Sequence, residues 1–83
     1  ETRGATLFVD LLAVDPAERN RGLGGELMRR AETYGLETGC LEVRLFVDER
    51  NARARRFYSR LGYWPVRRVP PLRVVEMYKP LFM

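Results

Sequence analysis

The sequence predicts an α/β fold in which helices alternate with the strands of a mixed α+β sheet. Residues 6–14 form a near-continuous apolar run, interrupted by Asp10, and are expected to be a central strand covered on both faces. Residues 23–38 carry apolar side chains at helical spacing, and residues 41–47 alternate between apolar and polar side chains. A strand, a helix and a strand in this order are typical of a parallel crossover unit.

The first expected helix places four residues at helical spacing on the face that we expect to pack on the sheet: Leu23, Leu27, Ala31 and Tyr34. Arg29 and Arg30 fall toward the opposite, solvent-facing side. Gly39 follows the expected end of this helix and is a suitable C-terminal cap.

The second half of the chain predicts another helix and two strands. Asn51 is a good N-cap, and Gly62 ends the helix. The buried stripe of this helix is expected to be Ala54, Phe57, Tyr58 and Leu61, at positions i, i+3, i+4 and i+7. Strands are expected at residues 63–69 and 73–78, separated by a turn at Pro70 and Pro71. The 83 residues are therefore expected to form a single small domain.

Composition excludes several kinds of site. The chain has no histidine and a single cysteine, Cys40, so histidine-based triads, histidine ligands and cysteine-rich metal sites are excluded, and no metal is expected. The net charge of +4 is carried almost wholly by arginine and suits an anionic partner, such as a phosphorylated cofactor, nucleic acid or an acidic surface. No apolar run is long enough to span a membrane, and we expect a cytoplasmic protein without membrane partners.

The turn between the first strand and the first helix has the features of an anion-binding loop. It contains Arg19 and Arg21, which supply charge and hydrogen-bond donors, and the glycines Gly22, Gly24 and Gly25. Glycines let the backbone approach a ligand closely, and the first N–H groups of the following helix attract an anion. The alternative is a plain connection between a strand and a helix.

The spacing in this turn separates it from two other phosphate loops. It lacks the third glycine of a dinucleotide-binding fingerprint and the lysine of a Walker loop. It reads R-x-x-G-x-G from Arg19 to Gly24, with Val14 and Pro16 just upstream. This pattern resembles motif A of the GNAT family of N-acetyltransferases, in which the loop holds the pyrophosphate of acetyl-CoA. Downstream, the stretch N-x-x-A-x-x-F-Y-x-x-L-G-Y from Asn51 to Tyr63 resembles motif B of the same family.

The resemblance implies which residues contact acetyl-CoA. The end of the first strand pairs its backbone with the pantetheine arm, through Leu12, Ala13 and Val14. The loop residues that hold the pyrophosphate are Arg19, Asn20, Arg21, Gly22, Leu23 and Gly24. Asn51 hydrogen-bonds the pantetheine or serves only as a helix cap. Tyr58 stands near the cofactor sulfur, where a phenol donates to the departing thiolate, or is simply a core residue.

The implied reaction is direct attack of a primary amine on the thioester, which makes the chain an acetyl-CoA-dependent N-acetyltransferase. Asp10 is a candidate general base, although a structural aspartate at a strand edge or cap is the competing interpretation, and bound waters serve as the base in some family members. Two other functions remain open: a CoA-binding or assembly module without catalysis, and a small basic nucleic-acid binder. The expected arginine-rich helix supports the binder only weakly.

The chain is shorter than a whole domain of this family. Residues 1–83 are expected to be a single partial domain, the cofactor-binding half, truncated at its N-terminal side. Three interpretations of this short length are open: the chain is the C-terminal part of a larger enzyme, it has been shortened, or it is an unusually short member of the family. We expect the sheet edge left by missing strands to favour a homodimer.

Overall fold

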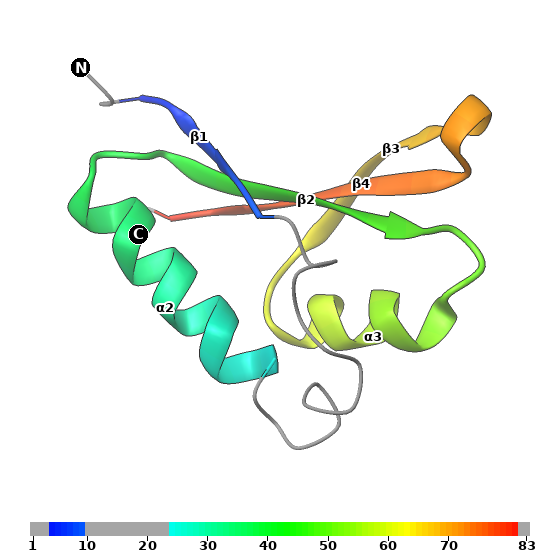
Figure 1. The fold of residues 1–83 in the computed structure, drawn as a ribbon, viewed down its shortest axis with the longest axis horizontal. Coiled ribbons are helices and arrows are strands. Elements are labelled where there is room, and N and C mark those ends of the chain that lie inside the picture. Colours follow the sequence, from blue (N-terminus) through cyan, green and yellow to red (C-terminus); the bar gives the residue numbers. More distant parts are fainter. Residues whose placement is uncertain (1–3, 10–23, 82–83) are drawn as a thin grey trace.

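The computed structural model describes residues 4–9 and 24–81 (Figure 1). In chain order the elements are β1 (Thr6–Phe8), α2 (Gly24–Glu37), β2 (Glu42–Asp48), α3 (Ala52–Arg60), β3 (Trp64–Val69), a short 3₁₀ helix (Pro70–Leu72) and β4 (Val74–Pro80). The 3₁₀ helix occupies the expected proline turn between the last two strands. Each element expected from residue 24 onward is present, with its ends shifted by at most a few residues. Of the first strand, expected at residues 6–14, the structure shows Thr6–Phe8, and residues 10–14 lie outside the described part of the chain.

The described strands form one mixed sheet in the order β1-β2-β4-β3. β1 is parallel to β2, with Leu7 opposite Val43, whereas β4 is antiparallel to both β2 and β3. Helix α2 connects the two parallel strands, as the strand, helix and strand pattern predicted. The fold class is therefore confirmed, because the described residues form two α-helices and a four-stranded mixed sheet.

Both helices lie on the same side of the sheet (Figure 1). The core on that side consists of Met28, Val43, Leu45, Val47, Tyr58, Tyr63, Val75 and Met77. Because side chains alternate along a strand, Val43, Leu45 and Val47 all point toward the helices, and their partners in β4 include Met77 and Val75. The alternation predicted for β2 is confirmed.

The prediction that both faces of the first strand are covered is wrong for the described residues. Phe8 of β1 is 59% exposed and stacks on Phe46 of β2, which is 45% exposed, with ring centroids 6.1 Å apart. Their side of the sheet carries no helix in the described part of the chain (Figure 1). β1 is also an edge strand of this sheet rather than a central one.

The predicted packing face of α2 is also wrong. Leu27 and Tyr34 are exposed, and the buried residues are Gly24, Met28 and Gly35. The reason is close approach. A Cβ atom on Gly35 would lie 2.8 Å from Cδ1 of Leu81, so the helix packs through Met28 and its glycines rather than through Leu27 and Tyr34. Leu23 lies outside the described residues.

The ends of both helices form as predicted. The side chain of Asn51 accepts a hydrogen bond from the backbone N–H of Ala54 at 3.0 Å, which is the expected N-cap of α3. Gly39 and Gly62 have φ values of 84° and 97°, the left-handed conformation of a helix-ending glycine. After α2 the N–H of Cys40 donates to the carbonyl of Gly35 at 2.8 Å, which closes the last turn.

Candidate functional site

Most residues of the predicted cofactor loop lie outside the described part of the chain. These are Leu12, Ala13, Val14, Arg19, Asn20, Arg21, Gly22 and Leu23, together with the candidate base Asp10. Three predicted site residues are described: Gly24, Asn51 and Tyr58. The structure places the first at the start of α2 and the other two on or next to α3.

Gly24 brings the N-terminus of α2 against α3. It is buried, and a Cβ atom added to it would lie 3.4 Å from Cζ of Phe57. Its neighbour Gly25 has nearly open space beside it, because a Cβ atom there would meet only the guanidinium of Arg29, at 3.9 Å. The N–H groups that an α-helix leaves unpaired at its first turn therefore lie close to the helix that carries Tyr58.

Asn51 is an exposed N-cap whose two polar atoms have separate uses. Its carbonyl oxygen accepts the N–H of Ala54, which satisfies one of the orphan donors of α3. The side-chain amide group of Asn51 is a donor and takes no part in this cap. Capping and ligand binding are thus compatible at Asn51, because they employ different atoms.

Tyr58 is a core residue as well as a candidate site residue. Only 5% of it is exposed, and its ring meets those of Phe57 and Tyr63 edge to face, at centroid distances of 5.0 and 6.0 Å. The ring of Tyr58 is therefore part of the core, as the structural alternative predicted. The packing fixes the direction of the ring without assigning a role to its hydroxyl group.

A polar cluster next to these rings was not predicted from the sequence. The buried Tyr63 donates its hydroxyl proton to Glu32 at 2.7 Å, and Lys79 donates to the other oxygen of the same carboxylate at 3.0 Å. Burial, followed by the hydrogen bond to Glu32, raises the pKa of Tyr63 far above its ordinary value. The cluster ties α2 to the end of α3 and to β4. The only signal in the sequence was that Lys79 is the single lysine.

A second unpredicted cluster lies on the sheet face opposite the helices. Glu76 is 4% exposed and accepts hydrogen bonds from Arg67 at 2.6 Å and from Arg44 at 3.1 Å. Arg44 also donates to Glu42 at 2.6 Å, and Thr6 donates to the same carboxylate. The hydrogen bond from Arg67 holds the pKa of Glu76 below its ordinary value, and the one from Arg44 does so for Glu42. The two carboxylates and two arginines neutralise one another across β2, β4 and β3, and the hydrogen bond from Thr6 joins β1 to the cluster.

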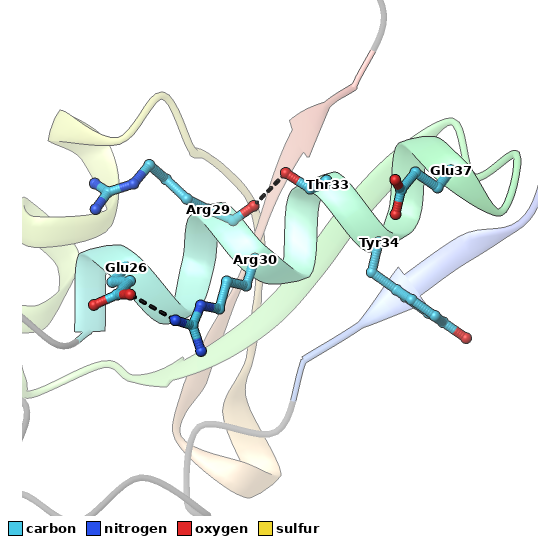
Figure 2. Close-up of a pocket in the computed structure, with 6 residues that line it drawn as sticks. All are labelled: Glu26, Arg29, Arg30, Thr33, Tyr34 and Glu37. Atoms are coloured by element: carbon cyan, nitrogen blue, oxygen red, sulfur yellow. Dashed lines mark hydrogen bonds and ion pairs between the residues drawn. The ribbon is translucent and has the colours of Figure 1, made fainter.

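A pocket on α2 contains none of the predicted site residues (Figure 2). Its lining consists of Glu26, Arg29, Arg30, Thr33, Tyr34 and Glu37. All six come from one helix, so no second element among the described residues closes it. Arg30 points toward Glu26 and pairs with it at 2.8 Å, a pair one helical turn apart of a kind common on solvated helices (Figure 2). We therefore place the candidate site at the junction of α2 and α3.

Neither described helix is long and apolar enough to cross a lipid bilayer. Within the same residues, no group of three or more acidic, histidine or cysteine side chains is arranged to hold a metal ion.

Comparison with known proteins supports the resemblance seen in the two motifs. The chain is 42% identical over 62 residues to a mycothiol acetyltransferase of Beutenbergia cavernae, a match covering 75% of this chain and 21% of the relative. It is 30% identical over 60 residues to a thialysine N-epsilon-acetyltransferase of Bos taurus, covering 72% and 35%. It is 36% identical over 62 residues to the N-alpha-acetyltransferase MAK3 of Arabidopsis thaliana, covering 75% and 33%.

The chain thus spans between a fifth and about a third of the length of these curated relatives. No solved structure gives a significant match. The acetyltransferase (GNAT) family matches residues 2–63, which includes both the glycine-rich turn and the whole of α3. The chain belongs to the acetyltransferase (GNAT) family.

Proposed function

We propose that the protein transfers an acetyl group from acetyl-CoA to a primary amine by direct attack of the amine on the thioester. Family membership supports acetyl transfer in general. The structural observation that carries the proposal is the contact of Gly24 with Phe57, because it sets the N-terminus of α2 beside the helix of Asn51 and Tyr58. An anion-binding helix end and a candidate acid then share one site.

The residues present fit the cofactor. Gly24 and Gly25 have no side chains, so the backbone at the start of α2 is open to close approach by a pyrophosphate. Arg19, Arg21 and the rest of the loop through Leu23 would surround the same phosphates. The strand residues Leu12, Ala13 and Val14 would hold the pantetheine arm through their backbone. The amide group of Asn51 would donate to an oxygen of that arm.

Acetyl-CoA supplies an acetyl group that is already activated as a thioester. In the proposed mechanism, backbone N–H groups of the first strand polarise the thioester carbonyl as the amine attacks. Tyr58 donates a proton or a hydrogen bond to the departing sulfur. A phenol, with an ordinary pKa near 10, keeps its proton at neutral pH, whereas a thiol has an ordinary pKa of about 8.5. Asp10 is the proposed base for the amine, with bound water as the alternative route.

The proposal is tested by measuring release of the CoA thiol from acetyl-CoA in the presence of a panel of amines. The panel should include a peptide with a free N-terminus, a lysine side-chain analogue and small primary amines, with matched alcohols as controls. We expect release above the rate of hydrolysis with at least one amine and with no alcohol. Binding of acetyl-CoA without release with any amine would contradict catalysis.

That second outcome corresponds to the other candidate, a CoA-binding or assembly module without catalysis. Nucleic-acid binding is disfavoured, because the arginines of α3 lie within a stretch that motif B already accounts for. An affinity for DNA that falls steeply with salt would reverse this judgement.

We also propose self-association through a sheet edge. β1 and β3 are the edge strands of the sheet formed by the described residues, and β3 is exposed along nearly its whole length. Light scattering coupled to size-exclusion chromatography should show a dimer. A clean monomer at high concentration would contradict this proposal.

A further inference from the structure

The side chains of α3 divide into two sets by their position around the helix. Asn51, Arg55 and Tyr58 are spaced i, i+4 and i+7, so they fall on one flank. Arg53, Arg56 and Arg60 are exposed and fall on the other flank. Arg55 is therefore the one arginine of α3 that shares a flank with both described site residues of this helix.

Arg55 differs from the other arginines in its surroundings. It is half-buried, and its Nε atom is shielded from solvent and has no hydrogen-bond partner. It is the only shielded side-chain polar atom without a partner among the described residues. Several described arginines outside α3 pair with a carboxylate: Arg30, Arg44, Arg50, Arg67 and Arg68. A shielded donor without an acceptor is rare in folded proteins and calls for a physical explanation.

The helix itself supplies no acceptor for Arg55. α3 contains no acidic residue, and its first turn carries arginine where a carboxylate would suit the helix dipole. Because no described residue accepts from Nε, an oxygen acceptor brought by a ligand would satisfy this donor.

We propose that Arg55 is a further cofactor-binding residue, which donates from Nε to an acceptor oxygen of acetyl-CoA on the flank shared with Asn51 and Tyr58. The inference rests on the proposed function and adds a residue to that site. The acceptor is an oxygen of the cofactor, and two groups supply one: a phosphate, or an amide carbonyl of the pantetheine arm. Both accept a hydrogen bond from a guanidinium.

The test is calorimetric titration of acetyl-CoA into the wild-type chain and into the variants Arg55→Gln, Arg55→Lys and Arg56→Gln. Arg56→Gln is the matched control, because it removes the same charge from the adjacent residue on the exposed flank. Losing a hydrogen bond to a charged or strongly polar group typically weakens binding about tenfold or more. We expect that loss with Arg55→Gln, and also with Arg55→Lys, which keeps the charge but lacks Nε.

Circular dichroism first establishes which variants are folded. Arg55→Lys keeps a long cationic stem, so it remains informative if Arg55→Gln does not fold. Affinity unchanged by Arg55→Lys, or lowered equally by Arg56→Gln, would overturn the inference while leaving the proposed function intact. A folded wild-type chain that does not bind acetyl-CoA at all would overturn both.

S-acetylpantetheine and dephospho-CoA distinguish the two acceptor groups. If Arg55→Gln lowers the affinity for S-acetylpantetheine by the same factor as the affinity for acetyl-CoA, the acceptor is a carbonyl of the pantetheine arm. If the variant lowers the affinity for acetyl-CoA but not for S-acetylpantetheine, the acceptor is a phosphate. Titration with dephospho-CoA, which lacks the 3′-phosphate, then separates that group from the pyrophosphate.

Discussion

The backbone N–H of Tyr63 donates to the carbonyl of Tyr58 at 3.0 Å, and the two rings meet edge to face with centroids 6.0 Å apart. The N–H of Gly62 donates to Ser59 at 3.0 Å, which completes the double hydrogen bond that ends many helices at a left-handed glycine. The leucine, glycine and aromatic sequence at the end of motif B is thus a helix stop. It also places the ring of Tyr63 against Tyr58, the candidate acid.

This relationship makes Gly62 a sensitive position. Its φ of 97° is strained for any residue with a Cβ, so Gly62→Ala should lower the free energy of unfolding by about 1–2 kcal/mol. Urea denaturation measures the change. The control is Gly25→Ala, where a Cβ meets open space within a helix, and which should be neutral or slightly stabilising. Equal effects of the two substitutions would contradict the assigned helix stop.

Tyr58→Phe separates the ring of Tyr58 from its hydroxyl group. The aromatic contacts with Phe57 and Tyr63 are retained, so the variant should fold. If the hydroxyl serves the departing thiolate, turnover should fall by about a hundredfold or more, with little change in the affinity for acetyl-CoA. Steady-state release of the CoA thiol gives the first quantity and calorimetry the second. A variant with full turnover removes Tyr58 from the mechanism.

Asn51 can be tested as cap and as ligand separately. Asn51→Ser keeps a side-chain oxygen suited to capping but lacks the amide donor, so stability should change by only a few tenths of a kcal/mol. Affinity for acetyl-CoA should nevertheless fall severalfold. Asn51→Ala should lose both properties, with a destabilisation of about 1 kcal/mol. If Asn51→Ser binds the cofactor like the wild type, then Asn51 is a cap alone.

The carboxylates on the sheet face opposite the helices predict how the free energy of unfolding depends on pH. The hydrogen bond from Arg67 lowers the pKa of Glu76 in the folded protein, while the unfolded chain should have a value near 4.3. A lowered folded pKa contributes stability above the unfolded pKa, and this stability is lost as the pH falls through the folded value. The free energy of unfolding should therefore fall below about pH 4.3.

Comparison of variants isolates the part due to Glu76. Glu76→Gln should cost about 1–3 kcal/mol at pH 7, because two arginines lose a buried charged acceptor, and much less at pH 3. Glu37→Gln, at an exposed position of α2, is the control and should change little at either pH. Part of the acid dependence should persist in Glu76→Gln, because hydrogen bonds from Arg50 lower the pKa of Asp48 to about 2. If Glu76→Gln lowered the free energy of unfolding equally at both pH values, the assigned pairing of the Glu76 carboxylate with Arg44 and Arg67 would be contradicted.

Local patterns predicted the fold well, whereas relations between distant residues were missed. The cap at Asn51, the glycine stops and the alternation of β2 follow from interactions between near neighbours, and each is confirmed. The packing face of α2 was wrong, because hydrophobic periodicity gives weight to Leu27 and Tyr34 and none to a glycine that permits close approach. A glycine in an amphipathic helix can therefore mark the packing face as well as a large apolar side chain does.

The two polar clusters were also missed because they join residues that are far apart in the sequence. Glu76 sits between Val75 and Met77 and looks like the polar half of an alternating strand, yet it is buried by arginines of β2 and β3. Glu32 and Tyr63 are 31 residues apart in the chain, and only the packing of α2 on the sheet brings them together. Within the candidate site, Gly24 lies against α3 and Asn51 caps the start of that helix. Their roles in binding the cofactor stay predictions.

Thermal unfolding with and without acetyl-CoA is the first test of whether this chain binds that ligand. At a hundred times its dissociation constant, acetyl-CoA should add about 2.7 kcal/mol to the free energy of unfolding. For a domain of this size the midpoint should rise by about 10 °C or more. ADP at equal concentration and ionic strength controls for a general effect of anions on a basic chain. We expect a saturable rise with acetyl-CoA that exceeds the rise with ADP. A cooperatively folded chain whose midpoint does not move would show that the described helix junction does not form a working cofactor site.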